Sequence, residues 1–221
     1  MLALLRLLDL ETGSIVVDGI DTARVPRSIL RERCFITVPQ DPFFLFDASL
    51  RFNLDSSGAY SDDQIISVLG KTRLWSHFVA SSSHQRHSSV AGTSSIGVLN
   101  HSLASLAALS SGQLQLLSLA RAILRSQMPS NQRTHTAAKP ILLLDEATSS
   151  LDLETERLIH RLIQKSFTDR GYTVIMIAHR LEAVAESMRP ASDIVVWMDE
   201  GSIVRTGARE DMMHVADLSE A

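Results

Sequence analysis

The sequence has very little cysteine, since Cys34 is the only one among 221 residues. A lone cysteine cannot form an internal disulfide, which excludes the small secreted domains that depend on disulfides for stability. Cys34 begins an apolar stretch, so we interpret it as a thiol of the core in a reducing compartment. This interpretation favours the cytosol.

Long apolar runs and an excess of basic charge are also lacking. No stretch approaches the roughly eighteen uninterrupted apolar residues that a membrane-spanning helix needs, so we expect any contact with a membrane to come through a partner. The net charge is −4 at pH 7, with both signs mixed along the chain, which argues against a nucleic-acid partner. Residues 1–10 are rich in leucine, but Arg6 and Asp9 interrupt them, so we expect a helix there and not a signal peptide.

The most informative stretch that is present is KPILLLDEATSSLD, residues 139–152. Its four consecutive aliphatic residues predict a strand buried on both faces of a parallel sheet. Asp145 and Glu146 follow at the carboxyl end, where open α/β sheets bind ligands. Asp145 suits a Mg²⁺ shell, and Glu146 could orient or deprotonate an attacking water, as phosphoryl transfer requires. The alternative is an ordinary strand end with two solvated acids.

Further strands and helices alternate along the chain and predict an α/β fold with a mostly parallel sheet flanked by helices. A strand over 35–38 ends at Gln40, and a buried strand over 173–178 ends at His179, where a structural hydrogen-bonding role is the alternative. The other expected elements are a short strand at 14–17, a helical turn over 26–33, a helix over 62–75 capped by Ser61, an irregular connection over 80–95, a helix over 152–167 capped by Ser150 or Asp152, short helices near 182–188 and 211–215, and a hairpin of strands 193–198 and 202–206.

Residues 109–125, LSSGQLQLLSLARAILR, predict a helix with leucines along one face. Ser110, Ser111 and Gly112 would present free backbone N–H groups at its positive end, which is a favourable place for an anion. An ordinary helix cap is the alternative.

Four phenylalanines, Phe43, Phe44, Phe46 and Phe52, lie in a loop-rich segment that follows Gln40. Aromatic residues this dense in a loop either pack into a small subdomain or form a surface for a partner.

Taken in order, Gln40 after a strand, LSSGQ at the start of a helix, ILLLDE, SSLD and IAHR resemble the nucleotide-binding domain of ATP-binding cassette proteins. The resemblance covers nearly the whole chain. It implies a single domain over 1–221 with a P-loop NTPase-like sheet and a helical signature subdomain at about 55–125. The polar residues 126–139, which include Pro129, predict an insertion that is either disordered or a surface excursion. The resemblance also implies ATP and Mg²⁺ as cofactors, and ATP hydrolysis coupled to export across a membrane.

The resemblance assigns four residues to catalysis and metal binding. Gln40 is the Q-loop glutamine, with a catalytic role and a place in the metal shell. Asp145 is the Walker B acid that binds the metal, Glu146 is the catalytic glutamate, and His179 is the switch histidine.

The resemblance also assigns the residues that contact the nucleotide. Ser110, Ser111, Gly112 and Gln113 belong to the signature motif, and Asp152 closes the D-loop. Ser111 stands where the commonest signature has glycine, which narrows the backbone freedom without removing an N–H donor.

Within the family, LFDASLRFNLD and the helix that ends at Trp75 resemble the second cassette of multidrug-resistance-associated exporters. This implies that the region Phe43–Asn53 docks on the transmembrane domains of an exporter. It further implies a second nucleotide-binding domain as partner and a location at the cytoplasmic face of a membrane.

One motif of the family, the phosphate loop G-x-x-x-x-G-K-[ST], occurs nowhere in the sequence. Gly70, Lys71 and Thr72 imitate its end, but Ile65 stands where the first glycine is needed. We therefore expect that the Walker A strand and the first β-subdomain strands are missing from this sequence and would lie upstream of Met1. ATP turnover by the chain alone should then be near background. The alternatives are a non-catalytic half-site that only donates its signature motif to a partner cassette, or a truncated fragment.

Overall fold

The computed structural model describes residues 1–84, 95–106, 108–128, 139–148, 151–178, 184, 187–189 and 192–208. Two compact units divide the chain, Met1–Ile177 and Ala178–Ala221. The first unit carries nearly all the predicted site residues, so its sheet and helices come first.

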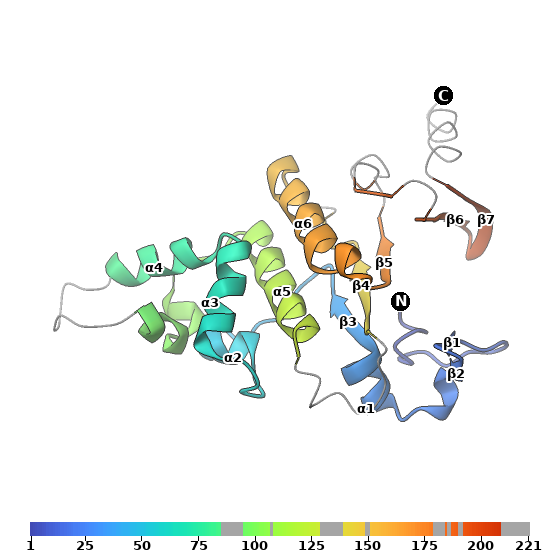
Figure 1. The fold of residues 1–221 in the computed structure, drawn as a ribbon, viewed down its shortest axis with the longest axis horizontal. Helices are drawn as coiled ribbons and strands as arrows, with labels where there is room; N and C mark the ends of the chain where they lie inside the picture. The colour runs from blue at the N-terminus through green and yellow to red at the C-terminus, as the bar shows by residue number, and fades with distance from the viewer. Residues whose placement is uncertain are drawn as a thin grey trace. The chain divides into compact units, whose positions relative to one another are not determined.

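The first unit is built on a parallel sheet of three strands, in the order β3-β4-β5. They are β3 (Phe35–Val38), β4 (Ile141–Asp145) and β5 (Val174–Ile177). All three run in the same direction (Figure 1), with helices between them along the chain. The predicted α/β class with a parallel sheet flanked by helices is therefore confirmed.

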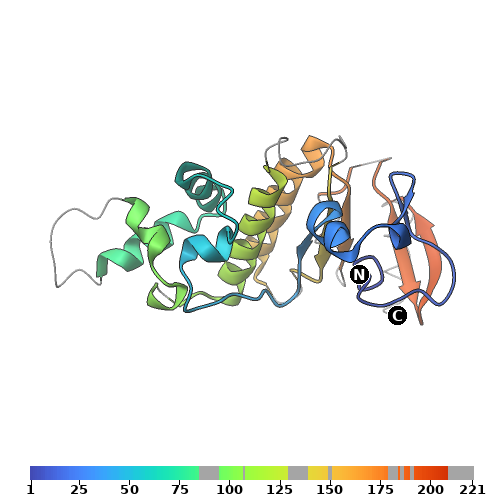
Figure 2. The same ribbon diagram turned by 90° about the horizontal axis from the view of Figure 1, so that it is seen from below.

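Both faces of the sheet are covered at β4, and at β3 except where Thr37 is exposed, because alternate side chains of these strands join different cores. Leu142 and Leu144 pack into the larger core, whereas Leu143 packs with Phe35 in a smaller one. The helices α5 (Ser111–Ser126) and α6 (Leu153–Ser166) lie on one side of the sheet, and α1 (Arg27–Ile29) lies on the other (Figure 2). A strand buried on both faces explains the unbroken aliphatic run of β4.

The strand β5 differs from the prediction of a buried strand. Ile175 and Ile177 are 36% and 38% exposed. Val174 and Met176 pack against the larger core. Ile175 and Ile177 lie on the opposite face, and the smaller core on that face includes neither of them.

A set of short helices lies beyond α5, away from the sheet (Figure 1). The predicted helix over 62–75 is instead two helices, because Arg73 has a positive φ of 60° that no α-helix continues through. The predicted irregular connection over 80–95 begins later than expected, since α4 continues to His84, and residues 85–94 lie outside the described part of the chain. The elements of this set are α2 (Leu50–Leu54), α3 (Asp62–Lys71), α4 (Trp75–His84), η3 (Ser95–Asn100) and η4 (Leu103–Ser105).

The predicted helix over residues 1–10 was wrong, because the structure has turns there. Arg6 lies in the left-handed region at φ 50°, which interrupts a helix. Its guanidinium donates hydrogen bonds to the carbonyls of Thr22, at 3.0 Å, and Val25, at 2.6 Å. Leu4 and Leu5 still pack against the smaller core, so the leucines serve burial without forming a helix.

The segment between residues 14 and 34 matches the prediction more closely. A hairpin of β1 (Val16–Val17) and β2 (Ile20–Asp21) precedes the short helix η1 (Thr22–Arg24). The helical turn predicted over 26–33 is present as α1, which continues into the π-helix η2 (Leu30–Cys34). The predicted core thiol Cys34 packs against the smaller core and is only partly buried. The 3-10 helix η6 (Thr168–Arg170) follows α6 later in the unit.

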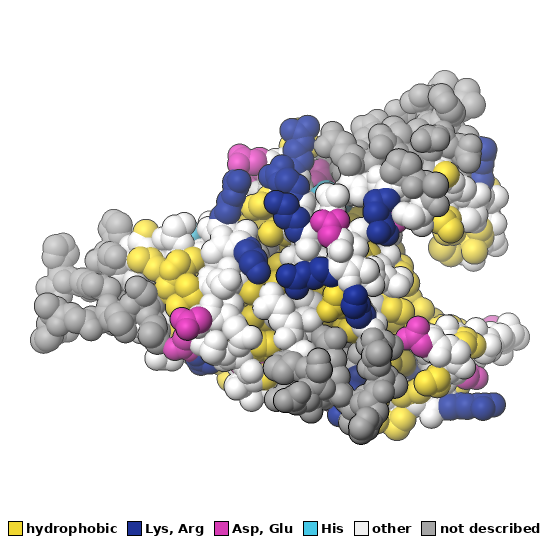
Figure 3. Space-filling view, in the orientation of Figure 1, with side chains coloured by type: hydrophobic (Ala, Val, Ile, Leu, Met, Phe, Trp, Pro, Cys, Tyr) yellow, Lys and Arg dark blue, Asp and Glu magenta, His cyan; other side chains and the backbone are white. Residues whose placement is uncertain are grey.

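The exposed side of α6 is basic. Arg157, Arg161 and Lys165 recur every four residues on it, so they share one face of the helix. Figure 3 shows Lys and Arg side chains gathered over this part of the molecule. The opposite face of α6 carries Ile159, Leu162 and Ile163 into the core, as expected of an amphipathic surface helix.

The second unit contains the predicted hairpin, formed by β6 (Val195–Asp199) and β7 (Ser202–Gly207) in antiparallel pairing. Glu200 and Gly201 both have positive φ, 43° and 78°, as a tight two-residue hairpin turn requires. The helix predicted near 211–215, and most of that near 182–188, lie outside the described residues. In the part of the chain that is described, no helix has the length and apolar character to span a membrane.

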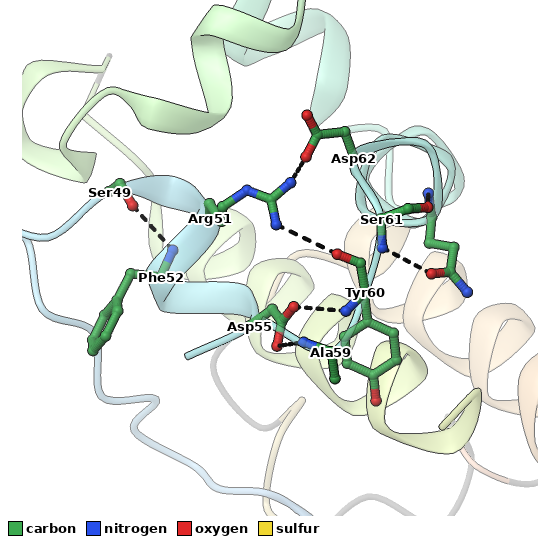
Figure 4. A network of polar contacts seen from close by, with 9 residues as sticks. Ser49, Arg51, Phe52, Asp55, Ala59, Tyr60, Ser61 and Asp62 are labelled. Atoms are coloured by element: carbon green, nitrogen blue, oxygen red, sulfur yellow. Dashed lines mark hydrogen bonds and ion pairs between the residues drawn. The ribbon is translucent and has the colours of Figure 1, made fainter. Parts of the chain in front are cut away.

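A polar network around Asp55 joins α2 to the start of α3 (Figure 4). Asp55 is 6% exposed and accepts hydrogen bonds from Tyr60 N at 2.8 Å, Ala59 N at 3.1 Å and Ser57 Oγ at 2.9 Å. Burial raises the pKa of its carboxyl, but these hydrogen bonds together outweigh burial and hold the pKa below its usual value. Arg51 closes the network through an ion pair with Asp62.

We predict that Asp55→Ala lowers the free energy of unfolding by about 2 kcal/mol at neutral pH, because two backbone N–H groups lose their buried acceptor. The folded-state pKa is lowered, so this stabilisation is complete above the ordinary Asp pKa of about 4 and is lost as the pH falls through the folded-state pKa. Urea unfolding of both proteins across this range checks the sign. Asp63→Ala removes an exposed acid of α3 and is the control; a gap between the wild type and Asp55→Ala that widened below about pH 4 would contradict the assignment.

Candidate functional site

The carboxyl ends of β3 and β4 bring the first predicted site residues to one edge of the sheet. Val38 pairs with Leu144 near the ends of two neighbouring strands, and Gln40 and Glu146 each follow two residues after this pair. Gln40 is exposed, and both Asp145 and Glu146 are half-buried. An amide and two carboxylates therefore lie at the same edge of the sheet, although they are more than a hundred residues apart along the chain.

The backbone at Glu146 is strained. Its φ of 49° is in the left-handed region, which costs a non-glycine residue about 1–2 kcal/mol. The N–H of Glu146 donates to the carbonyl of Ile177 at 3.2 Å, so β5 helps to hold this conformation. Strain of this kind at a carboxylate that ends a strand is typical of functional sites.

The signature segment, Ser110–Gln113, forms the start of α5. Ser110 caps the helix by accepting a hydrogen bond from Gln113 N at 3.2 Å, while Gln113 Oε1 accepts from Ser110 N at 2.9 Å. The ordinary-cap alternative is thus present in full. This cap uses the side chains of Ser110 and Gln113 but does not involve the N–H groups of Ser111 and Gly112, which lie at the positive end of the helix. A cap and an anion site are therefore compatible here.

The helix α5 runs antiparallel to β3, which places its first turn beyond the edge that carries Gln40. Gln115 Nε2 donates to the carbonyl of Pro39 at 3.0 Å and to the carbonyl of Gln40. At the other end of the same strand, Arg125 donates to the carbonyl of Phe35 at 3.2 Å. Ser111 precedes Gln115 by one turn, so it lies about 6 Å further along the helix axis.

The start of α6 lies against the start of α5. Asp152 caps α6 by accepting from Thr155 N at 2.9 Å, which decides between the two predicted caps in favour of Asp152. Hydrogen bonds from the backbone and side chain of Thr155 hold the pKa of Asp152 below its usual value. A Cβ on Gly112 would lie 3.1 Å from Thr155 Cγ2, so glycine permits the close approach of the two helix ends.

Sequence reasoning did not single out Gln115. Its side chain is only 5% exposed, and its amide orientation is fixed because Nε2 meets two carbonyls. The available signal was a glutamine within an otherwise apolar helix face. His179, the predicted switch histidine, lies outside the described residues.

The oxygen donors at the edge suit Mg²⁺ better than a transition metal. No cluster of three or more His, Cys, Asp or Glu side chains occurs within the described ranges. Mg²⁺ typically takes one or two carboxylates, keeps several waters and completes its shell with substrate phosphates. Asp145 with Gln40 fits that pattern, so these residues could hold a Mg²⁺ ion together with a nucleotide.

These features together define an α/β domain of the P-loop NTPase-like class, with acids at the carboxyl edge of a parallel sheet and a helix N-terminus beyond it. No protein-family model matches the chain. Curated proteins do match it. The chain is 40% identical over 216 residues to "ABC transporter FGM5" of Gibberella zeae, and the match covers 96% of this chain and 13% of that protein.

Two further relatives are sub-family C members from mammals. "ATP-binding cassette sub-family C member 2" of Rattus norvegicus is 39% identical over 210 residues, covering 95% of this chain and 11% of the relative. The human protein of the same name is 38% identical over 212 residues, covering 96% and 12%. The chain belongs to the ATP-binding cassette family and spans about an eighth of the length of the relatives it matches.

We predict that Glu146→Gly unfolds with a free energy about 1 kcal/mol higher than Glu146→Ala. Both variants lose the carboxylate, but only glycine adopts the left-handed backbone without strain. Chemical denaturation of the two variants side by side measures the difference. The control compares the wild-type alanine at position 147, which has no positive φ, with Ala147→Gly, and there the protein with alanine should be the more stable. Equal stability of the two Glu146 variants would refute strain at position 146.

Proposed function

We propose that this chain is nucleotide-binding machinery of an ATP-driven exporter, working with Mg²⁺-ATP. The observation that carries the proposal is the gathering of Gln40, Asp145 and Glu146 at adjacent strand ends, with the N-terminus of the signature helix beyond the same edge. Homology to ATP-binding cassette transporters supports it.

In this proposal each group has a chemical task. Asp145 and Gln40 would hold Mg²⁺, which when bound would supply positive charge to the phosphates of ATP. Glu146 would orient the attacking water or remove its proton, and His179 would stabilise the transferring phosphoryl group. The strained backbone at Glu146 supports this role, since strain at such a position is typical of functional sites.

The signature segment serves a second site, contributed largely by a partner cassette. The free N–H groups of Ser111 and Gly112 face a phosphate of ATP that the partner holds, and Asp152 shapes the neighbouring helix end. These N–H groups can act only on a nucleotide outside their own helix, which supports a two-domain site.

A second candidate is that the chain only donates its signature segment and does not hydrolyse ATP by itself. Residues 1–221 contain no G-x-x-x-x-G-K-[ST], the loop that supplies several phosphate-binding N–H groups and a lysine. Mg²⁺-ATP binding by the purified chain separates the two, since tight binding would exclude the purely donating role.

The proposed membrane partner docks on an exposed apolar area, the aromatic surface, made of Phe43, Leu45, Phe46 and Phe52. These side chains are 74%, 48%, 49% and 46% exposed, respectively. Figure 4 shows the ring of Phe52 pointing away from Asp55 and Tyr60 of the polar network. We propose that transmembrane domains of the exporter cover this surface at the cytoplasmic face of a membrane.

We predict that Ser111→Glu abolishes the ATP turnover that this chain adds to a complete cassette domain. A carboxylate at the first helical position is favoured by the helix dipole, so the fold is retained while the phosphate is repelled. The measurement is phosphate release by the mixture, compared with the complete cassette alone.

The matched control is Ser28→Glu, the same change at an exposed position in the first turn of α1. It should leave the turnover of the mixture within about twofold of the wild type, because surface changes away from a site have small effects. Equal turnover with Ser111→Glu, or a wild-type chain that adds nothing, would refute donation of the signature segment.

We also predict that Phe43→Ser with Phe46→Ser weakens capture by detergent-solubilised transmembrane domains of a related exporter about tenfold or more. Burying one aromatic side chain contributes about 1.5–3 kcal/mol, and each 1.4 kcal/mol is tenfold in affinity. Ile203→Ser with Val204→Ser, both 64% exposed on β7, is the control. Undiminished capture by the Phe double variant would remove the aromatic surface from the proposal.

A further inference from the structure

The aromatic surface is anchored to the signature helix by one side chain. Arg121 of α5 donates from Nε to the carbonyl of Asn53 at 2.8 Å. Both of its terminal nitrogens lie 3.4 Å from the carbonyl of Phe43. Its guanidinium also stacks over the buried ring of Phe44, 4.6 Å from the centroid. Arg121 therefore contacts the backbone at both ends of the segment 43–53 and the ring of Phe44 within it.

Asn53 carries this anchoring into the loop of the aromatic surface. The side chain of Asn53 is buried, accepts from Leu45 N at 2.9 Å and donates to the carbonyls of Leu45 at 2.8 Å and Ser49 at 3.1 Å. Because Arg121 binds the backbone of Asn53, the loop and α2 are attached to α5 as one piece.

If Arg121 served the stability of the fold alone, a partly buried positive charge at this position would be unfavourable. Arg121 is half-buried, burial lowers its pKa, and the positive charge of Arg125 one turn away lowers it further. Within the described ranges no carboxylate forms an ion pair with it. A planar guanidinium does what neither leucine nor lysine can, because it binds separate carbonyls from different nitrogens while stacking on a ring.

A second contact on the same helix binds the other end of this segment. Gln115 holds the carbonyls of Pro39 and Gln40, so the chain between β3 and α2 is attached to α5 at both ends. The signature segment begins this helix, and Arg121 lies seven residues after Leu114, about 10 Å along the axis.

We propose that Arg121 is a positioning residue that makes the aromatic surface and the signature segment one rigid unit. A partner bound at Phe43, Phe46 and Phe52 thereby changes the freedom of the first turn of α5. This rests on the proposed function in one respect only, the docking of transmembrane domains. The proposal goes beyond that function by naming Arg121 as the residue through which docking affects the signature segment.

The experiment measures amide hydrogen exchange of the full chain with and without detergent-solubilised transmembrane domains of a related exporter. Two groups of amides report separately. Those of residues 43–53 report docking, and those of Gln113 and Leu114, which bond to Ser110, report the signature turn. In the wild type, docking should slow exchange about fivefold or more in both groups.

Arg121→Lys keeps the charge but loses the planar fork, so protection of residues 43–53 should remain while protection of Gln113 and Leu114 disappears. Arg125→Lys is the matched control. Arg125 lies one turn later on the same helix and binds the carbonyls of Glu32 and Phe35, but none in the aromatic surface. Arg125→Lys should retain the protection of residues 43–53 and that of Gln113 and Leu114, even where either variant is less stable than the wild type.

The outcomes separate this proposal from the proposed function. Protection of residues 43–53 without any change at Gln113 and Leu114 in the wild type overturns the rigid unit and leaves docking intact. Protection of both groups in Arg121→Lys, or equal losses in Arg121→Lys and Arg125→Lys, overturns the role of Arg121. No protection of residues 43–53 in the wild type overturns docking and the linkage with it.

Discussion

The parallel pairing of β3 with β4 is the constraint on which the site depends. Once Val38 is level with Leu144, Gln40 and the acids at the end of β4 share one edge of the sheet. A slip of one residue would turn Leu142, Leu143 and Leu144 to the wrong faces, so burial on both sides fixes the register. The position of the functional groups therefore follows from the packing of aliphatic side chains that take no part in the chemistry.

The helix α5 adds a second constraint, because it binds the chain around β3 through backbone carbonyls. Gln115 binds just after the strand, Arg125 at its start and Arg121 further along the chain. Bonds to carbonyls hold the backbone itself, whatever side chains it carries. The nucleotide side and the apolar surface proposed for docking are consequently attached to one helix of the ATP-binding cassette fold.

Patterns in the sequence predicted most of the elements that carry the site. The aliphatic run of β4, the serine cap of α5 and the acid cap of α6 each rest on local physics, either burial on two faces or hydrogen bonding to free N–H groups. The prediction of a helix over residues 1–10 was wrong because the spacing of the leucines fits a helix, whereas Arg6 adopts a left-handed backbone. The helix over 62–75 failed for the same reason at Arg73, since side-chain patterns do not encode a positive φ outside glycine.

The sequence by itself determined the fold class, the motifs and the cassette resemblance, because these depend on residue order and short-range periodicity. Tertiary structure alone decided that Glu146 is held in a strained conformation, that Gly112 lies against Thr155, and that Gln115 and Arg121 bind carbonyls some seventy residues away in sequence. Such contacts arise when packed elements bring distant backbone groups within hydrogen-bonding reach. No local pattern of residues records which groups will meet.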